Sequence, residues 1–208
     1  MLQTQTVEPG TLSLLNELFS LPALEDFGLV GGTALSLKLG HRLSVDLELF
    51  SPKKFENSLL IKKLTDHFGN RLLIRTNPPP IGIFCFIDKI KVDLVKHPHP
   101  LIKPLENIED IRFFSDQDIM AMKIQAILGR GKKKDFWDIA ELLQYYSVVD
   151  FIQNHKEKYS TQNLLISIPQ VMIYFQDAEE DEDPVSLKDQ TWDGIKKTIR
   201  EKVSEYLR

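Results

Sequence analysis

The chain has 208 residues, 42% of them hydrophobic and 9% aromatic, which is enough apolar material for one large domain or two small lobes. The formal net charge of −4 argues against a protein that coats nucleic acid through bulk positive charge, but it does not exclude a local basic cleft. With a single cysteine, Cys85, no apolar run of roughly 18 residues and no signal-peptide pattern, we expect a cytoplasmic protein without an internal disulfide or a membrane partner.

The first half of the sequence predicts alternating helices and strands. Apolar residues three or four positions apart indicate helices, and alternating apolar and polar residues indicate strands. In chain order we expect a helix over 11–21, a strand over 27–30, a helix over 33–39, a strand over 45–50, a helix over 56–68, and strands over 72–75, 81–87 and 90–95. The last two strands are separated by Asp88-Lys89, which suits a tight hairpin.

The second half predicts helices, over 119–128, 135–145, 163–175 and 191–207. The acidic segment 177–183 is interpreted as a solvated loop. This change of character predicts an α+β molecule with two lobes. We expect an N-terminal lobe over 1–112 with a mixed β-sheet and flanking helices, and a C-terminal helical lobe over 113–208 that completes a cleft.

Three acidic residues on two predicted strands are candidate metal ligands. Asp46 and Glu48 lie two positions apart, so their carboxylates share one face and repel each other unless a cation neutralises them. Asp93 lies in the middle of the strand over 90–95, between valine and leucine. Three acids from two strands can hold one or two Mg²⁺ ions, in the arrangement that serves phosphoryl transfer. An ordinary strand edge also tolerates an acid-x-acid pair, so this spacing alone is weak evidence.

Gly31-Gly32, followed by Thr33, is a candidate phosphate site. The bare N–H groups of a glycine turn and the positive end of the next helix attract an anion, and Thr33 adds a hydroxyl. A Gly-Gly pair is more often only a tight connection. Combined with the acids on the next strand, it indicates a triphosphate and its metal at one site. Neither the P-loop nor the dinucleotide fingerprint is present.

A cationic cluster follows in the helical half. Lys123 lies on an otherwise apolar helix face and can extend its ammonium to a cleft. Arg130 and Lys132-Lys133-Lys134 precede the helix that begins near Asp135. Cations are unfavourable at a helix N-terminus unless Asp135 or a nucleotide phosphate lies close by. A solvated connection between two helices is the other interpretation.

These residues resemble the motifs of a known family. The stretches GGTAL at 31–35 and GHRLSVDLELF at 40–50 are similar to the opening motif of the AbiEii nucleotidyltransferase toxins. The segment from Lys123 through Arg130 to KDFWD at 134–138 is similar to that family's helical motif, and WDGIKK at 192–197 to its last helix. The resemblance extends from about Leu29 to the C-terminus.

The resemblance implies a fold like that of DNA polymerase β and a catalytic site for an NTP with Mg²⁺. Gly31, Gly32 and Thr33 would hold the triphosphate. Asp46, Glu48 and Asp93 would bind Mg²⁺, and Lys123 and Asp135 would complete the catalytic set. Further implied nucleotide-binding residues are Arg42, Ser44, Arg130 and Lys134. The implied partners are a tRNA or protein acceptor and the cognate antitoxin of a bacterial type IV toxin–antitoxin system.

One position departs from the family's pattern, which usually carries aspartate where this chain has Glu48. A glutamate reaches about one methylene further, and Mg²⁺ demands near-ideal octahedral geometry, so reduced or lost activity is an alternative expectation. Three functions therefore remain open: an Mg²⁺-dependent toxin that transfers NMP, a catalytically silent nucleotide- or partner-binding module, and a transferase for a small molecule.

Overall fold

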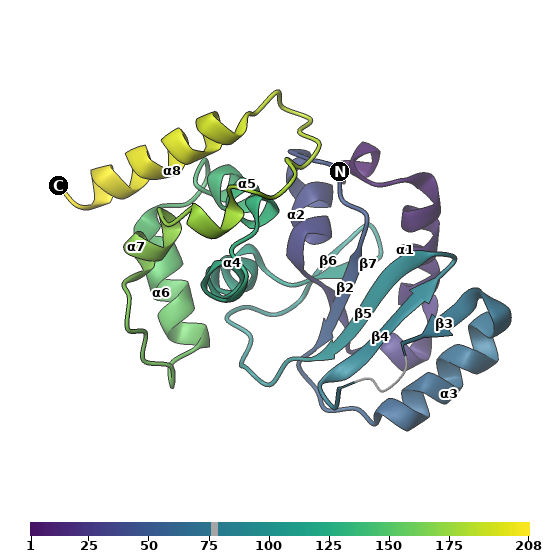
Figure 1. Cartoon of the computed structure of the whole chain (residues 1–208). Coiled ribbons are helices and arrows are strands. Elements are labelled where there is room, and N and C mark those ends of the chain that lie inside the picture. The colour runs from purple at the N-terminus through teal and green to yellow at the C-terminus, as the bar shows by residue number, and fades with distance from the viewer. Residues whose placement is uncertain (76–78) are drawn as a thin grey trace.

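The computed structural model describes residues 1–75 and 79–208 and has a sheet lobe and a helical lobe side by side (Figure 1). Within the described residues, seven strands form one mixed sheet in the order β3-β4-β5-β2-β1-β7-β6. The strands are β1 (Gly28–Leu29), β2 (Leu47–Ser51), β3 (Leu72–Ile74), β4 (Gly82–Ile87), β5 (Ile90–Lys96), β6 (Glu106–Ile108) and β7 (Ile111–Phe113). The predicted α+β class is confirmed.

The register of two central strands brings the predicted acids together. Strands β2 and β5 pair in parallel, with Glu48 directly opposite Asp93. The chain reaches β5 through a hairpin from β4, where Asp88 and Lys89 have φ of 50° and 68°, the positive values that tight two-residue hairpin turns require. The predicted hairpin is therefore confirmed, and Glu48 and Asp93 share one face of the sheet.

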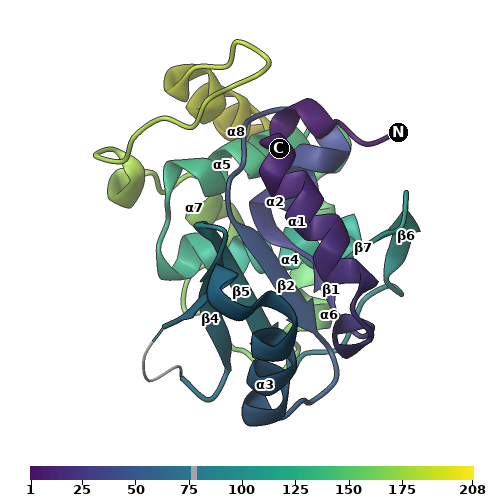
Figure 2. The ribbon, with the colours of Figure 1, turned by 90° about the vertical axis from the view of Figure 1, so that its right-hand side faces the viewer.

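Helices cover both faces of the sheet. Figures 1 and 2 show α1 and α3 on one face, and α2 with the helical lobe on the other. The helices are α1 (Pro9–Ser20), α2 (Gly31–Leu39), α3 (Asn57–Phe68), α4 (Asp116–Gly129), α5 (Lys133–Leu142), α6 (Val148–Lys158), α7 (Ile168–Met172) and α8 (Trp192–Tyr206). The last strand ends at Phe113 and α4 begins at Asp116. The division at 112/113 stays a prediction.

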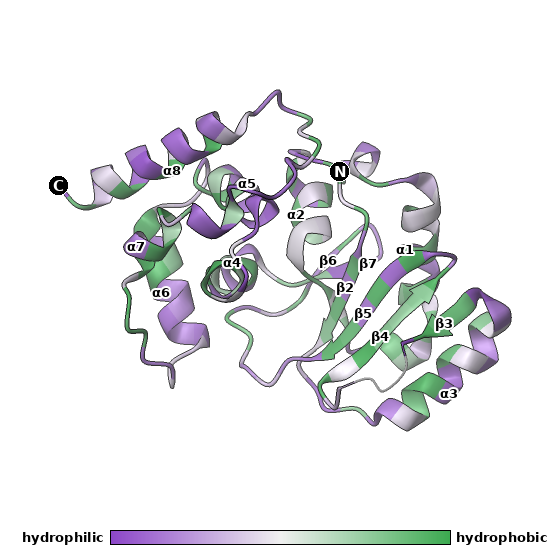
Figure 3. Cartoon of the chain, viewed as in Figure 1, coloured by the Kyte–Doolittle hydropathy of each residue, from purple (hydrophilic) through white to green (hydrophobic). Residues whose placement is uncertain are grey.

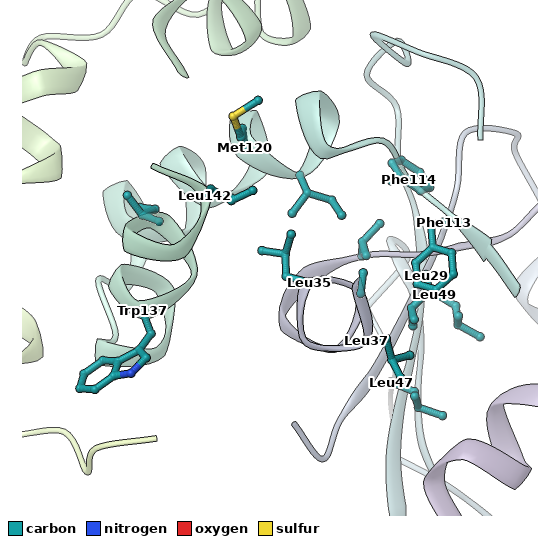
Figure 4. Close-up of a cluster of buried hydrophobic side chains, with 14 of the residues drawn as sticks. Leu29, Leu35, Leu37, Leu47, Leu49, Phe113, Phe114, Met120, Trp137 and Leu142 are labelled. Atoms are coloured by element: carbon teal, nitrogen blue, oxygen red, sulfur yellow. The ribbon is translucent and has the colours of Figure 1, made fainter. Parts of the chain in front are cut away.

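The main core surrounds α2. Leu35 and Leu37 of this helix have no exposed surface, and they lie between the sheet residues Leu47 and Leu49 and the helices α4 and α5 (Figure 4). Figure 3 shows hydrophobic residues concentrated in the central strands, with hydrophilic turns along α8. A helix that is apolar on most of its surface is buried by contacts with elements on several sides. Because both lobes bury α2, its N-terminus has a fixed position between them.

The helical lobe differs from the prediction in two places. Helix α6 has no counterpart among the predicted helices, and the helix expected over 163–175 shrinks to α7 and a 3-10 turn over Gln176–Ala178. Pro169 lies in the first turn of α7, and Ser167 forms a capping box with Gln170. A proline is tolerated in the first turn but not further inside, so it prevents the helix from starting at residue 163.

The hairpin of β6 and β7 was also not predicted. Each strand has three residues, too few for an alternating pattern to be visible. Its turn uses Glu109 and Asp110 with φ of 51° and 64°, although neither is a glycine. Strand β7 pairs in parallel with β1 and extends the sheet beyond the strand that precedes the glycine turn.

Candidate functional site

A cavity of about 510 Å³ opens between the two lobes, at the N-terminus of α2. We call it the first cavity. Acidic residues that begin β2 and cationic residues at the α4–α5 junction lie on its opposite walls. Its lining includes Gly32, Thr33, Arg42, Ser44, Asp46, Glu48, Lys123, Arg130, Lys132, Lys134 and the segment 181–185. Most of the residues predicted to bind a nucleotide therefore lie around one cavity.

The two glycines allow side chains to lie directly against the start of α2. Gly31 has φ of +70°, and a Cβ there would collide with Oε2 of Glu48. A Cβ on Gly32 would collide with Nη2 of Arg42. No side chain caps α2, so within the described residues its first N–H groups have no side-chain acceptor. The helix start therefore offers backbone donors and a positive dipole end to an anion.

Thr33 and Ser44 fix the segment that carries Asp46. The hydroxyl of Thr33 lies 2.7 Å from Oγ of Ser44 and also donates to the backbone carbonyl of Asp46. Thr33 is 2% exposed, so these bonds are shielded from water. The hydroxyl that the sequence suggested for phosphate binding thus positions Asp46 in this structure.

The acidic wall is lined by Asp46, just before β2, and Glu48 within β2, and Asp93 on β5 lies directly beside Glu48 but outside the lining. Oδ2 of Asp93 accepts a 2.7 Å hydrogen bond from Nζ of Lys91, while its buried Oδ1 has no partner among the described residues. Burial alone would lower the pKa of Lys91, but the hydrogen bond to Asp93 and the charges of Asp46 and Glu48 raise it. One ammonium is therefore influenced by all three carboxylates.

These carboxylates fit a hard cation chemically. Glu48 and Asp93 lie side by side on one sheet face, and all three residues supply only oxygen, the ligand that Mg²⁺ prefers. The unpartnered Oδ1 of Asp93 is an available ligand atom. In residues 1–75 and 79–208, no group of three or more His, Cys, Asp or Glu side chains is close enough to surround a metal ion. The acids would have to converge for a cation to be held.

The opposite wall rests on a buried ion network centred on Asp138. Oδ1 of Asp138 lies 2.8 Å from Nε2 of His41 and accepts from Nε of Arg42 at 2.7 Å, and Oδ2 accepts from Nη2 of Arg42 at 3.0 Å. Nζ of Lys123 pairs with the same carboxylate at 2.5 Å. Asp138 has no exposed surface. A carboxylate at α5 therefore fixes three basic side chains from two lobes.

Asp135 fixes the remaining cations from the same helix. It accepts from Nζ of Lys123 at 2.9 Å and from Nε and Nη2 of Arg130 at 3.0 and 3.1 Å. Asp135 is fully buried and is not among the residues that line the first cavity. Its contacts with the cavity run through Lys123 and Arg130, which do line it.

The buried acids and bases of this network stay ionised because each has an opposite charge close to it. Burial alone would raise the pKa of Asp138, but Arg42 and Lys123 hold it well below its usual value. Burial alone would lower the pKa of Lys123, but Asp135 and Asp138 raise it. Such pairs persist inside a protein because each charge has a close partner.

Lys134 extends from the cationic side toward the acids. Its Nζ lies 3.9 Å from Oδ2 of Asp46, and 40% of its side chain is exposed. Burial and the nearby Arg130 lower its pKa. Unlike Lys123, Lys134 has no close carboxylate partner within 3.5 Å in the described residues, so an anionic ligand would relieve its repulsion with Arg130.

The second half of the acidic segment is anchored at the cavity, although the sequence suggested a solvated loop. Asp181 accepts from the backbone N–H of Lys133 at 3.1 Å, and Asp183 accepts from Nζ of Lys133 at 2.9 Å. The N–H of Leu43 donates to the carbonyl of Val185 at 2.9 Å. We call residues 181–185 the rim segment, because they line the first cavity from its edge.

Sequence reasoning missed the central carboxylate of the site. Asp138 follows Asp135 by three positions, so both side chains lie on the same face of α5, and this spacing was a usable signal. The contribution of His41 depends on a contact with Asp138, 97 positions away in the chain, whereas Lys91 bonds to Asp93 on the same strand. Asp93 was predicted and pairs with Glu48, but it is not among the residues that line the first cavity.

Comparison with known proteins identifies the family of the chain. Residues 13–206 match the family described as nucleotidyl transferase AbiEii toxin of a type IV toxin–antitoxin system. The chain belongs to the AbiEii family. It is also 33% identical over 203 residues to an uncharacterized protein of Aquifex aeolicus (strain VF5), covering 93% of this chain and 94% of that relative. The resemblance inferred from the motifs is confirmed.

Solved structures show the same fold at low identity. A putative nucleotidyltransferase from H. pylori is 16% identical, with a TM-score of 0.56 and coverage of 97% of this AbiEii chain and 99% of its own. MenT4, a nucleotidyltransferase toxin from Mycobacterium tuberculosis H37Rv, is 11% identical, with a TM-score of 0.63 and coverage of 93% and 81%. Within the described residues, no helix is long and apolar enough to cross a membrane.

Proposed function

We propose that this AbiEii protein is a Mg²⁺-dependent nucleotidyltransferase that moves NMP from an NTP to an RNA (tRNA-like) or protein acceptor, as the toxin of a type IV system. The observation that supports this most strongly is the first cavity itself, where an uncapped helix start and fixed cations lie opposite carboxylates. Phosphoryl transfer needs these two kinds of wall, because catalysis consists mainly of positioning and charge stabilisation.

The triphosphate would lie along the cationic wall. The start of α2 provides backbone N–H donors, and Arg130, Lys132 and Lys134 provide charge from the α4–α5 junction. Arg130 is held by Asp135 at 3.0 Å, so it needs little reorganisation to meet a phosphate. Arg42 and Lys123, which are nearly buried, would fix the floor of the site.

The acceptor hydroxyl would approach from the acidic wall. Asp46, Glu48 and Asp93 would hold Mg²⁺, which neutralises phosphate charge and orients the attacking oxygen when bound. Once the three acids converge on the cation, Oδ1 of Asp93, which has no partner among the described residues, would accept the proton of the acceptor hydroxyl. The acceptor oxygen bonds to the α-phosphorus, the bond between that phosphorus and the oxygen bridging to the β-phosphate breaks, and pyrophosphate leaves along the cationic wall.

A second candidate function is a silent nucleotide-binding module of the same fold. Glu48 lies against Gly31, and Lys91 already neutralises Asp93 from 2.7 Å. If these contacts persist with nucleotide bound, NTP would bind without transfer. If the extra methylene of Glu48 is what prevents transfer, Glu48→Asp, which shortens the side chain by one methylene, would gain activity.

The decisive experiment incubates the pure protein with each α-labelled NTP, Mg²⁺ and either total tRNA or cell protein. We expect label on one acceptor class, and a loss of at least about 100-fold in Asp46→Ala, because a ligand of the charge-stabilising cation is removed. Asp66→Ala on α3 is the matched control, since Asp66 is an exposed carboxylate far from the cavity lining. Equal transfer by wild type and Asp46→Ala would rule out the proposed catalytic role.

Growth of a host that expresses the chain distinguishes a toxin from a small-molecule enzyme. A toxin that modifies RNA or protein should arrest growth when expressed alone, and a cognate antitoxin should relieve the arrest. The Asp46→Ala variant should be harmless at the same expression level. Normal growth with active wild type, together with transfer to a small alcohol, would favour the small-molecule function.

A further inference from the structure

A second cavity of about 520 Å³ adjoins the first. The two share Glu48, Lys123 and Arg130, so these residues form a partition with a cavity on each side. The second cavity extends from Gly31 and the ends of β2 and β5 to α4 and the residue that follows α6. Its volume lies within the range of about 300–1,000 Å³ typical of small-molecule sites.

Aromatic rings form much of this second cavity. His99 and Tyr159 meet edge to face with ring centroids 4.5 Å apart, and His97 lies 5.3 Å from His99 and 5.8 Å from Phe50. On the α4 side, the lining is supplied by Ile119, Met122 and Ala126. Flat rings beside flexible methionine and short alanine side chains fit a planar ligand inserted between them.

The second cavity is nearly uncharged beyond the shared partition. Lys96 is the additional ionic residue in its lining, and its Nζ donates to the carbonyl of Pro80 at 3.0 Å. Burial and the charge of Lys158 lower the pKa of both His97 and His99, that of His97 to about 3. Both histidines are therefore neutral near pH 7, and phosphates are attracted to the first cavity instead.

Polar atoms suited to the edge of a planar ligand are also present. Tyr159 is 6% exposed, lines the cavity, and its hydroxyl forms no hydrogen bond with another described residue. Nε2 of Gln125 donates to Oε1 of Gln162 at 2.5 Å and lies 2.7 Å from Nε2 of His155. These contacts leave Oε1 of Gln125 and Nε2 of Gln162 for a ligand. An acceptor, a donor and a hydroxyl match the mixed edge of a heterocycle.

We propose that the second cavity is a nucleobase site, in which the base packs on His99 and Tyr159 and meets the glutamine amides at its edge. This inference rests on the proposed function in one respect, because it takes the phosphate site to be the adjoining first cavity. A neutral aromatic compartment and a cationic compartment joined at Arg130 match the two parts of a nucleotide. The base belongs either to the incoming NTP or to the terminal nucleoside of an RNA acceptor.

Calorimetry with three probes tests the site without relying on turnover. The probes are the four NTPs with Mg²⁺, inorganic tripolyphosphate with Mg²⁺, and adenosine alone. In Tyr159→Ala and in the milder His99→Ala, we expect NTP affinity to fall about 5- to 150-fold, the range for loss of one base–aromatic stack, while tripolyphosphate affinity stays unchanged. Tyr145→Ala is the matched control, because this tyrosine is 60% exposed and lines neither cavity.

A fluorescent single-stranded RNA 12-mer with a free 3′-hydroxyl identifies the source of the base. Reduced RNA affinity with unchanged NTP affinity would assign the cavity to the acceptor, and the reverse result to the incoming nucleotide. Either result supports a nucleobase site. Unchanged affinity for both ligands in folded Tyr159→Ala and His99→Ala, checked by circular dichroism, would overturn it.

The same experiments distinguish failure of the proposed function from failure of the nucleobase site. Absence of transfer together with absence of tripolyphosphate binding would reject the phosphate site in the first cavity. Adenosine binding that weakens in Tyr159→Ala and in His99→Ala would still support the second cavity. Transfer by wild type with full NTP and RNA affinity in both variants would instead reject only the nucleobase site.

Discussion

The two walls of the first cavity differ in how their charges are balanced. On the α4–α5 wall, Asp138 and Asp135 are fully buried and pair with Arg42, Lys123 and Arg130 at 2.5–3.1 Å. On the sheet wall, Asp93 keeps one oxygen unpartnered among the described residues, and Asp46 has Lys134 only at 3.9 Å. The cationic wall is thus fixed by close ion pairs, whereas the acidic side keeps carboxylate oxygens without a close partner among the described residues.

Because of this difference, substitutions in the two walls should affect the stability of the fold to different extents. Removing one member of a buried charge cluster leaves its partners unpaired in a medium of low dielectric constant, which is strongly destabilising. Removing one of several mutually repelling, partly exposed carboxylates costs little. Four measurements test the comparison, and they follow from the largest expected effect on stability to the smallest.

The largest effect is expected for Asp138→Ala. Arg42, Lys123 and His41 would lose their shared carboxylate, and we expect the free energy of unfolding to fall by about 3–5 kcal/mol. The measurement is urea unfolding at pH 7. Lys123→Met, which removes a cation from the same cluster, serves as a second variant. A loss below about 1 kcal/mol in both would show that the cationic wall is not held by this network.

Acidification should affect the sheet side before the network. Burial lowers the pKa of His97 from 6.5 to about 3, so the unfolded chain binds protons more readily between these values. The neutral, buried His97 therefore makes its full contribution to the free energy of unfolding above pH 6.5, and this contribution declines as the pH falls. The loss by pH 5 should be about 1–2 kcal/mol. By contrast, the lowered pKa of Asp138 delays loss of the network until pH values below its usual 3.8.

His97→Phe isolates this histidine in the pH experiment. The variant keeps a ring beside Phe50 and Phe114 but cannot take up a proton, so its stability should change less between pH 6.5 and pH 5. Parallel slopes for wild type and variant would contradict the assignment. Chemical unfolding at several pH values supplies both slopes.

A smaller effect is expected for Lys133→Met, which removes the ion pair to Asp183 but keeps the backbone hydrogen bond to Asp181. The side chain of Lys133 is 10% exposed, that of Asp183 is 53% exposed, and the pair is therefore partly screened. We expect a loss of about 1 kcal/mol or less. Hydrogen exchange should quicken at the amides of Leu43 and Leu187, which bond between the rim region and segment 41–43. Unchanged exchange there would show that Lys133 does not anchor the rim segment.

The smallest stability effect is expected for Asp46→Asn. Because Asp46 is one third exposed and lies near Glu48, its neutralisation should change the free energy of unfolding by less than about 0.5 kcal/mol. Thermal unfolding beside Asp66→Asn provides the comparison. Destabilisation as large as that of Asp138→Ala would mean that both walls are structural, and the contrast between them would disappear.

The sequence predicted features that depend on neighbouring residues. The glycine turn, the hairpin at Asp88-Lys89 and the acidic pair at the start of β2, with Asp46 just before the strand and Glu48 within it, are local patterns that are present in the structure. The motif similarity extended this prediction to the family. Helix α6 was missed although Ser147 and Asp150 form a capping box at its start, a signal visible in the sequence.

Features that depend on the relative position of distant segments were not predictable. The clustering of His41 and Asp138 spans 97 positions and requires both lobes to be in place. The second cavity likewise combines His99, Tyr159 and Gln125, which lie far apart in the sequence, and of these three only Gln125 falls within a predicted helix. Glu48 was predicted to bind metal, but its position against Gly31 depends on backbone geometry.

The rim segment has a consequence for how such a site can diversify. It contacts the first cavity from a loop, and the ion network beneath the cavity includes none of its residues. Loop residues tolerate substitution and insertion far better than buried charges do. If the first cavity works as proposed, changes over 181–185 would alter which acceptor reaches it while Asp135 and Asp138 keep the cations in position. Selectivity and phosphate binding would then be separately variable in this chain.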